Sequence, residues 1–195
     1  GNKIESYPSR VYRTMGFEAE TEYYKKMNLA KKKIIELLNA STPKGGRLNI
    51  VCDGELTGVF IHEALGHATE ADLVMAGSSC LKDKLGKKIG NGIVDVYDQG
   101  NLPGEFGSHS YDDEGVKSKK NCLIKEGVLR GYLTSRETAK VFDLPLTGNA
   151  RAEFANNIPI VRMTNTYIGE KDYTFDEIIR ELKDGVYLKG HRGGE

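Results

Sequence analysis

Near the start of the chain, apolar positions recur at helical spacing. Between residues 18 and 39 they lie three or four positions apart, with charged side chains between them. This pattern predicts a long amphipathic helix. The polar stretch at residues 41–46 contains a proline and two glycines, which predicts a linker and a domain boundary. We therefore expect one unit at residues 1–46 and a second at residues 47–195.

Beyond the linker, shorter apolar segments alternate with turn-forming residues. They predict a mixture of short strands and short helices, and so an α+β fold with mixed or mostly antiparallel sheets. The helices after residue 134 begin with serine or threonine caps. The expected strands are 48–53, 93–98, a hairpin over 121–133, a continuous strand at 160–168 and the start of another at 186–188; the expected helices are 135–142 and 174–183.

The stretch from Gly58 to Asp72 concentrates the chemistry of the sequence. His62 and His67 lie close together, and Glu63 follows the first of them. Histidine is the commonest metal-binding side chain, and a carboxylate beside a metal site can polarise water. We interpret this stretch as a zinc-hydrolase helix, capped by Thr57 and packed against the sheets. Its apolar start should lie in the core, and its acidic end should reach solvent.

The spacing of the two histidines is one residue too long for a regular helix. Residues four apart lie about 40° apart around a helix axis, whereas residues five apart lie about 140° apart. A π-bulge between Glu63 and His67 would bring the imidazoles together, as would a helix that ends near Gly66. We favour the bulge because residues 68–74 still have a helical pattern. The alternative is that His62 and His67 are ordinary polar positions on a buried helix.

Two acidic residues follow the histidines. Glu70 lies three positions after His67, where it can accept a hydrogen bond from the imidazole and orient it. Asp72 is a second candidate for this supporting role. A substitute metal ligand at Glu70, or a solvated helix end for both residues, are the alternatives.

The expected strand at 160–168 carries a group of polar side chains. Arg162, Thr164 and Asn165 lie close together on it. The edge of a sheet can bind an extended peptide through main-chain hydrogen bonds, with side chains such as Arg162 or Asn165 fixing the register. The alternative is that all three belong to an ordinary structural strand.

Composition narrows the possible functions. The 28 basic and 28 acidic residues cancel, which argues against nucleic-acid binding through overall charge. Three cysteines without a C-x-x-C pair indicate neither a disulfide framework nor a zinc finger. No apolar run is long enough for a membrane span and the start is not a signal peptide, so we expect a cytoplasmic protein. The ending at Arg192–Glu195, just after a strand-like start, indicates a fragment of a longer protein.

Five ordered segments resemble the TldD/PmbA family, whose members were once called modulators of DNA gyrase. The first is similar to the H-E-x-x-x-H signature of the TldD subunit, and the others to four further family motifs. The resemblance runs from about residue 47 to the end of the chain. The segments are Gly58–His67, Tyr111–Gly115, Gly127–Tyr132, Thr147–Arg151 and Arg162–Tyr167.

The resemblance implies a zinc-dependent peptidase in which His62 and His67 bind zinc and Glu63 is the general base. The family's third ligand is a cysteine that would lie beyond Glu195. Cys52, Cys80 and Cys122 do not match it. The chain would then hold the end of the N-terminal domain and the first part of the catalytic domain. By itself the chain is expected to be inactive. The resemblance does not decide whether this chain alone binds zinc.

The resemblance also implies partners. TldD pairs with PmbA, also called TldE, in a cytoplasmic heterodimer that degrades unfolded or modified peptides held in extended form. For this chain, the partner could be a PmbA-type subunit or a second copy. The rival hypothesis is a non-catalytic module that binds peptides or partners. Direct binding of DNA or gyrase is a further rival, which the balanced charge does not favour.

Overall fold

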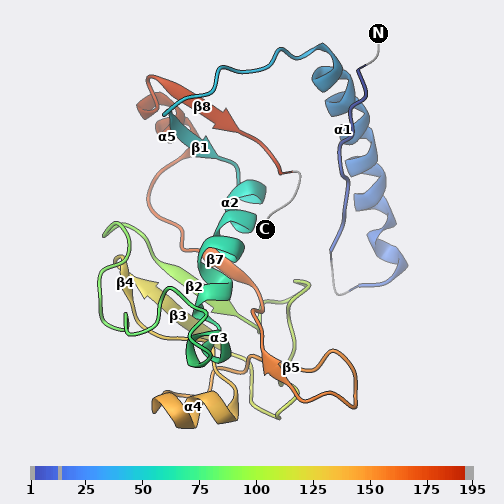
Figure 1. Cartoon of the computed structure of the whole chain (residues 1–195). Helices are drawn as coiled ribbons and strands as arrows, with labels where there is room; N and C mark the ends of the chain where they lie inside the picture. The colour runs from blue at the N-terminus through green and yellow to red at the C-terminus, as the bar shows by residue number, and fades with distance from the viewer. Residues whose placement is uncertain (1–2, 13–14, 192–195) are drawn as a thin grey trace.

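The protein combines short helices with short, mainly antiparallel strands (Figure 1). The computed structural model describes residues 3–12 and 15–191, so the terminal Arg192–Glu195 lies outside the described residues. The expected α+β class is confirmed. The helices are α1 (Glu20–Asn39), α2 (Gly54–Ile61), α3 (Ala71–Met75), α4 (Arg136–Phe142) and α5 (Phe175–Glu181); the strands are β1 (Asn49–Cys52), β2 (Val96–Gln99), β3 (Lys120–Lys125), β4 (Val128–Leu129), β5 (Ala150–Arg151), β6 (Ile160–Val161), β7 (Thr166–Ile168) and β8 (Gly185–Leu188).

The main sheet has the strand order β4-β3-β2-β7, and every pairing in it is antiparallel. Strands β5 and β6 form a second antiparallel pair. Strands β1 and β8 pair in parallel, with Asn49 opposite Gly185 and Cys52 opposite Leu188. The sheets are therefore mixed and mostly antiparallel, as the sequence predicts.

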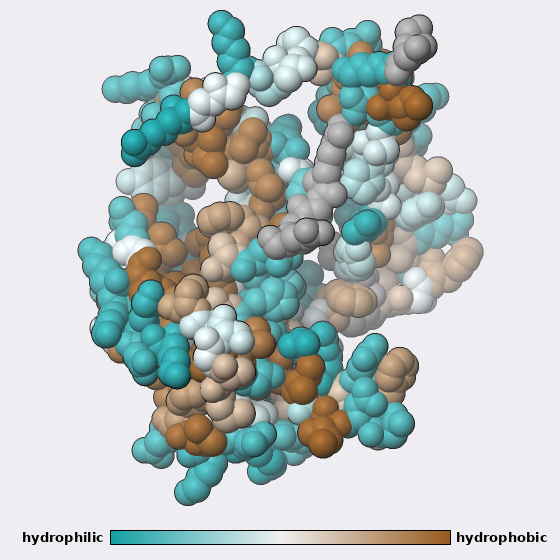
Figure 2. All heavy atoms as spheres, in the orientation of Figure 1, coloured by the Kyte–Doolittle hydropathy of each residue, from teal (hydrophilic) through white to brown (hydrophobic). Residues whose placement is uncertain are grey.

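Helix α1 agrees with the long helix expected at residues 18–39, with a 3-10 turn at Phe17–Ala19 in front of it. It stands beside the rest of the molecule, to which a linker joins it (Figure 1). Of its residues, only Ala30 is buried. Figure 2 shows further apolar side chains at the surface over α5, β1 and β8.

The core lies where α2, α3 and the segment between them pack against the main sheet. Leu65 and Val74 come from the helical side, and Leu123, Leu129 and Val161 come from the strands. Burial of these side chains is the main force that places the histidine-bearing segment on the sheet. Strand β7 contacts both α2 and the turn that follows it.

The start of α2 differs from the prediction. The expected cap was Thr57, but the helix begins at Gly54 and its N-cap is Asp53. The Asp53 carboxylate accepts a hydrogen bond from the Leu56 amide at 2.9 Å. Aspartate is as good an N-cap as serine or threonine, and Asp53 stands directly after β1, so the helix starts as soon as the strand ends.

The expected continuous strand at 160–168 is wrong. The chain forms β6, bends at Thr164 and Asn165, and resumes as β7. The bend wraps around the buried Asp98 carboxylate, which accepts hydrogen bonds from the Thr164 amide at 2.8 Å and from the hydroxyls of Thr164 and Thr166 at 2.6 and 2.8 Å. A straight strand would leave this buried charge without those donors, at a cost that the bend avoids.

The helix expected at residues 68–74 is interrupted at Glu70. There the backbone is extended (φ −68°, ψ 115°) and forms an isolated bridge with Leu133. Glu70 is fully buried, while Phe60 near the start of the segment is exposed. The expected direction of the segment, from core to solvent, is therefore wrong, because Glu70 finds partners inside the protein.

No helix among the described residues is long and apolar enough to cross a membrane. The three cysteines are free; Cys80 is exposed, whereas Cys52 and Cys122 are half-buried.

Asp95 generates a prediction about stability in acid. Its carboxylate accepts hydrogen bonds from the Glu126 amide, Lys171 and Lys125, at 2.7, 2.8 and 2.9 Å. These contacts hold the pKa of Asp95 well below its ordinary value. A lowered folded-state pKa adds stability above the unfolded value of about 3.9, and this stability is lost as the pH falls toward the folded value.

We expect Asp95→Asn to reduce stability near neutral pH and to flatten its decline below about pH 5. Urea unfolding at a series of pH values measures this. Asp172→Asn, at an exposed position, is the matched control. An unchanged pH slope in Asp95→Asn would contradict the assignment.

Candidate metal centre

A π-helical turn at His62–Gly66 follows α2 directly. The His67 amide donates to the His62 carbonyl, five residues back, so this turn holds one residue more than an α-helical turn. The predicted π-bulge is confirmed. The extra residue brings the imidazoles of His62 and His67 to one side of the helix, with ring centroids 4.7 Å apart and ring planes at 88°.

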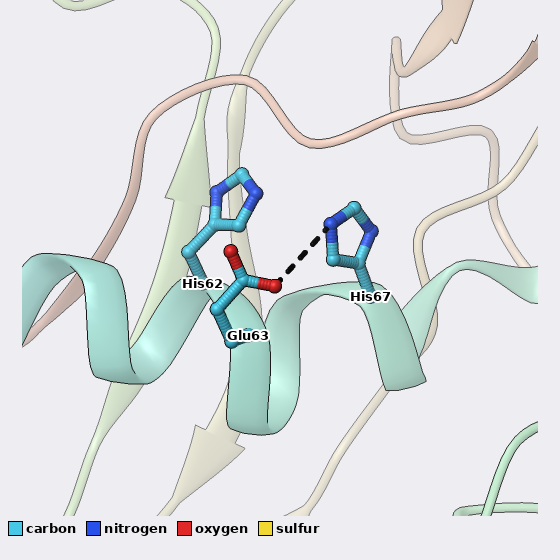
Figure 3. A group of neighbouring side chains, drawn as sticks. All are labelled: His62, Glu63 and His67. Carbon is cyan, nitrogen blue, oxygen red and sulfur yellow. Dashed lines mark ion pairs between the residues drawn. The ribbon is translucent and has the colours of Figure 1, made fainter. Parts of the chain in front are cut away.

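The Glu63 carboxylate lies beside the His62 ring, with one oxygen turned toward His67 (Figure 3). One potential ligand atom from each of His62, Glu63 and His67 lies within 4.8 Å of the others. The Glu63 Oε2 is 3.9 Å from the His67 Nε2. His62 is exposed, and Glu63 and His67 are half-buried, so the group opens to solvent on one side.

Two imidazoles and one carboxylate are ligand types that zinc binds. Zinc prefers imidazole nitrogens and carboxylate oxygens at about 2.0–2.2 Å, which places neighbouring ligand atoms of a tetrahedral site about 3.3 Å apart. The three candidate ligand atoms, all within 4.8 Å of one another, are close enough for side-chain rotation to bring them to a common ion. Within residues 3–12 and 15–191, no second group of three histidine, cysteine or acidic side chains is close enough to hold a metal.

Gly66 leaves space for the Met163 side chain to pack against the π turn. Its backbone is helical (φ −52°, ψ −57°), so space rather than conformation demands glycine here. A Cβ at this position would lie 2.0 Å from the Met163 Sδ. The segment after β6 therefore packs directly on the turn between the two histidines.

Glu70 contacts the side of the His67 ring that faces away from Glu63. Its Oε2 lies 3.2 Å from the His67 Nδ1 and 3.2 Å from the Arg162 Nη1. Burial raises the pKa of the Glu70 carboxyl, and the hydrogen bond and charges of His67 and Arg162 act in the opposite direction. The expected contact between Glu70 and His67 is present, whereas the alternative of a solvated helix end does not fit Glu70.

Asp72 has another task. Its Oδ1 accepts from the Leu73 amide at 2.8 Å, and its Oδ2 accepts from the Val161 amide at 3.1 Å. The second bond joins α3 to β6. Asp72 thus anchors two elements to each other, and its expected supporting role beside the histidines stays a prediction.

All three expected peptide-binding residues are engaged within the fold, Arg162 through its contact with Glu70. Thr164 binds Asp98, and Asn165 donates to the Gln99 carbonyl and the Ser108 hydroxyl at 2.8 and 3.0 Å. Arg162 and Thr164 also line a cavity of about 210 Å³. These bonds favour the structural alternative for Thr164 and Asn165, and peptide binding by this trio stays a prediction.

Comparison with known proteins identifies the family. The family model described as the PmbA/TldA metallopeptidase C-terminal domain matches residues 45–195. The chain belongs to this family. A metalloprotease of Methanocaldococcus jannaschii is 49% identical over 181 residues, covering 92% of this chain and 40% of that protein. A zinc metalloprotease TldD homolog of Saccharolobus solfataricus is 38% identical over 168 residues, covering 84% of this chain and 36% of that protein.

Solved structures agree with the fold of this PmbA/TldA-family chain. A proposed modulator of a DNA gyrase from Thermotoga maritima superposes with a TM-score of 0.74 at 26% identity, covering 88% of this chain and 38% of that one. TldE from Thermococcus kodakarensis superposes with a TM-score of 0.72 at 22% identity, covering 89% and 39%. The chain spans less than half the length of these relatives.

Sequence reasoning missed the partnership between Arg162 and Glu70. These residues are 92 positions apart, and no local pattern links them. His109, which belongs to no motif, is half-buried, and its Nε2 lies 3.1 Å from the Gly148 carbonyl. Asp98, the hub of the bend at 164–165, carried no motif of its own.

Gly66 provides a test of the packing on the π turn. We expect Gly66→Ala to destabilise the protein by about 1–3 kcal/mol, because the methyl group displaces the buried Met163 side chain. Gly58→Ala is the control, since a Cβ there meets nothing within 4 Å. At a helical position this control should be neutral or stabilising by up to about 1 kcal/mol.

Chemical unfolding measures both variants. Met163→Ala removes the clashing side chain, so Gly66→Ala should cost less in that background than alone. Equal costs for Gly66→Ala in the two backgrounds would show that Met163 does not constrain the turn.

Proposed function

We propose that this chain carries the zinc-binding helix of a peptidase. The observation that supports this most is the π turn, which gathers His62, Glu63 and His67 where a regular helix would separate the two histidines. Bulged turns of this kind concentrate at functional sites. The names of the relatives, metalloprotease and zinc metalloprotease TldD homolog, support the same activity.

In this proposal His62 and His67 hold the ion through their imidazoles. When bound, zinc polarises the scissile carbonyl and lowers the pKa of a water molecule to about 7. Glu63 takes the proton of the attacking water and passes it to the leaving amine, as a general base and then a general acid. Its place beside the two imidazoles suits this transfer (Figure 3).

The finer parts of the proposal concern the whole protein. A third zinc ligand, a cysteine by resemblance to the family, would come from outside this sequence. The substrate would be an unfolded or modified peptide in extended form, and the partner a PmbA- or TldE-type subunit or a second copy. A cytoplasmic location belongs to the same proposal.

The test uses a protein of the relatives' full length that contains this chain. We expect stoichiometric zinc and peptide hydrolysis that a chelator abolishes. Glu63→Gln should retain zinc and lose about 10²–10⁴-fold in kcat, the usual worth of a general base. His62→Ala and His67→Ala should lose zinc and activity, and His109→Ala, which alters a histidine outside the group, should lose neither.

Two outcomes would change the assignment. Loss of zinc from Glu63→Gln would make this carboxylate a ligand instead of a base. Peptide binding without hydrolysis, in a protein that contains no zinc, would favour the non-catalytic binding module.

A further inference from the structure

A chain of polar contacts extends from the candidate metal centre into the protein. The His67 Nε2 faces Glu63, while its Nδ1 faces Glu70. The same oxygen of Glu70 that meets His67 also accepts from Arg162. His67, Glu70 and Arg162 thus form a line in which the buried carboxylate lies in the middle.

Glu70 depends on Arg162 for a charge partner. Its side chain is fully buried, and its Oε1 has no hydrogen-bond partner among the described residues. A buried carboxylate is costly unless it is paired with a positive charge and hydrogen-bonded. The guanidinium of Arg162 supplies the permanent charge, since arginine stays protonated in proteins.

Arg162 is held in place by its own backbone. Its amide donates to the Asn149 carbonyl at 2.8 Å, and its carbonyl accepts from the Asn149 side chain at 2.9 Å. Its Nη1 also donates to the Val161 carbonyl at 3.0 Å. These bonds direct the guanidinium toward Glu70.

The orientation of His67 follows from these contacts. A carboxylate at Nδ1 favours the tautomer with the proton on Nδ1, which leaves the lone pair of Nε2 facing Glu63 and His62. Without the carboxylate, the ring could rotate or exchange its tautomer. A ligand nitrogen that is already aimed at the ion saves the cost of ordering it on binding.

We propose that Arg162 is a positioning residue for His67, acting through Glu70, rather than a contact for the substrate. The role in metal binding rests on the proposed function, but the effect on the His67 ring does not. Arg162 would set which nitrogen of His67 is available, although it never reaches the ion itself.

The first experiment needs no metal. In chain labelled with ¹⁵N at histidine, two-bond ¹H–¹⁵N spectra, recorded at a pH at which the ¹⁵N shifts themselves show neutral rings, report the tautomer of each ring. We expect His67 to carry its proton on Nδ1 and to lose this preference in Arg162→Ala. Arg151→Ala is the matched control, because Arg151 lines the same cavity as Arg162 and is exposed.

Glu70→Gln separates positioning from folding. Glutamine keeps an oxygen for the His67 proton but needs no counter-charge. Arg162→Ala should therefore change His67 in the wild-type background and leave it unchanged in the Glu70→Gln background. If Arg162→Ala alone lowers the melting temperature, the spectra are compared below its transition; if it fails to fold, Arg162→Gln, which also removes the charge, takes its place in both backgrounds.

The second experiment uses a protein of the relatives' full length that contains this chain, and titrates zinc into it against a chromogenic chelator. We expect Arg162→Ala to weaken zinc binding about 10- to 100-fold, the usual effect of losing support behind a metal-binding histidine, while Arg151→Ala has no effect. Arg162→Lys, which restores the charge, should recover part of the affinity. If wild-type protein binds no zinc, the proposed function fails, and the tautomer result still decides the role of Arg162.

An unchanged His67 spectrum in Arg162→Ala alone would overturn the proposal, and so would an equal change in the Glu70→Gln background, because Arg162 would then not act through Glu70. An equal response to Arg151→Ala would also overturn it. A raised KM with unaltered zinc affinity and an unaltered His67 ring would return Arg162 to substrate binding.

Discussion

The candidate site depends on a single extra residue in the helical turn between His62 and His67. In a regular helix their imidazoles would point about 140° apart and could not share an ion. The π turn removes this obstacle without breaking the chain direction, because the helix continues from α2 into the turn. Such a turn loses regular hydrogen bonding, so it persists only where the surrounding structure holds it.

Packing from a distant segment provides that support. Met163 lies against Gly66, Arg162 against Glu70, and the Val161 amide binds Asp72. Three successive residues thus contact the histidine-bearing segment at three places, which are Gly66, Glu70 and Asp72. Immediately after these three residues the chain bends around the buried Asp98, where the sequence alone suggests a continuous strand.

The prediction from sequence succeeded where the physics is local. The period of α1, the capped starts of α4 and α5, and the two histidines five positions apart all give short-range signals, and the last of these even specified the bulge. The prediction failed where a buried carboxylate is bonded to residues far away in the sequence. Asp98 bends the strand expected at 160–168, and Glu70 interrupts the helix expected at 68–74. Asp98 carries no motif in the sequence, and although the contact of Glu70 with His67 was expected, nothing local indicates its partner Arg162, 92 residues away.

The number of donors determines what Glu63 can do. A catalytic zinc keeps three protein ligands and one open position. Here two imidazoles and one carboxylate converge, so Glu63 can complete the ligand set or serve as the base, but one carboxylate cannot do both at once. The base requires a third ligand from elsewhere, and none of the free cysteines joins the group of His62, Glu63 and His67. The open side at the exposed His62 leaves room for such a ligand to approach, and this geometry is the physical reason to favour proton transfer as the role of Glu63.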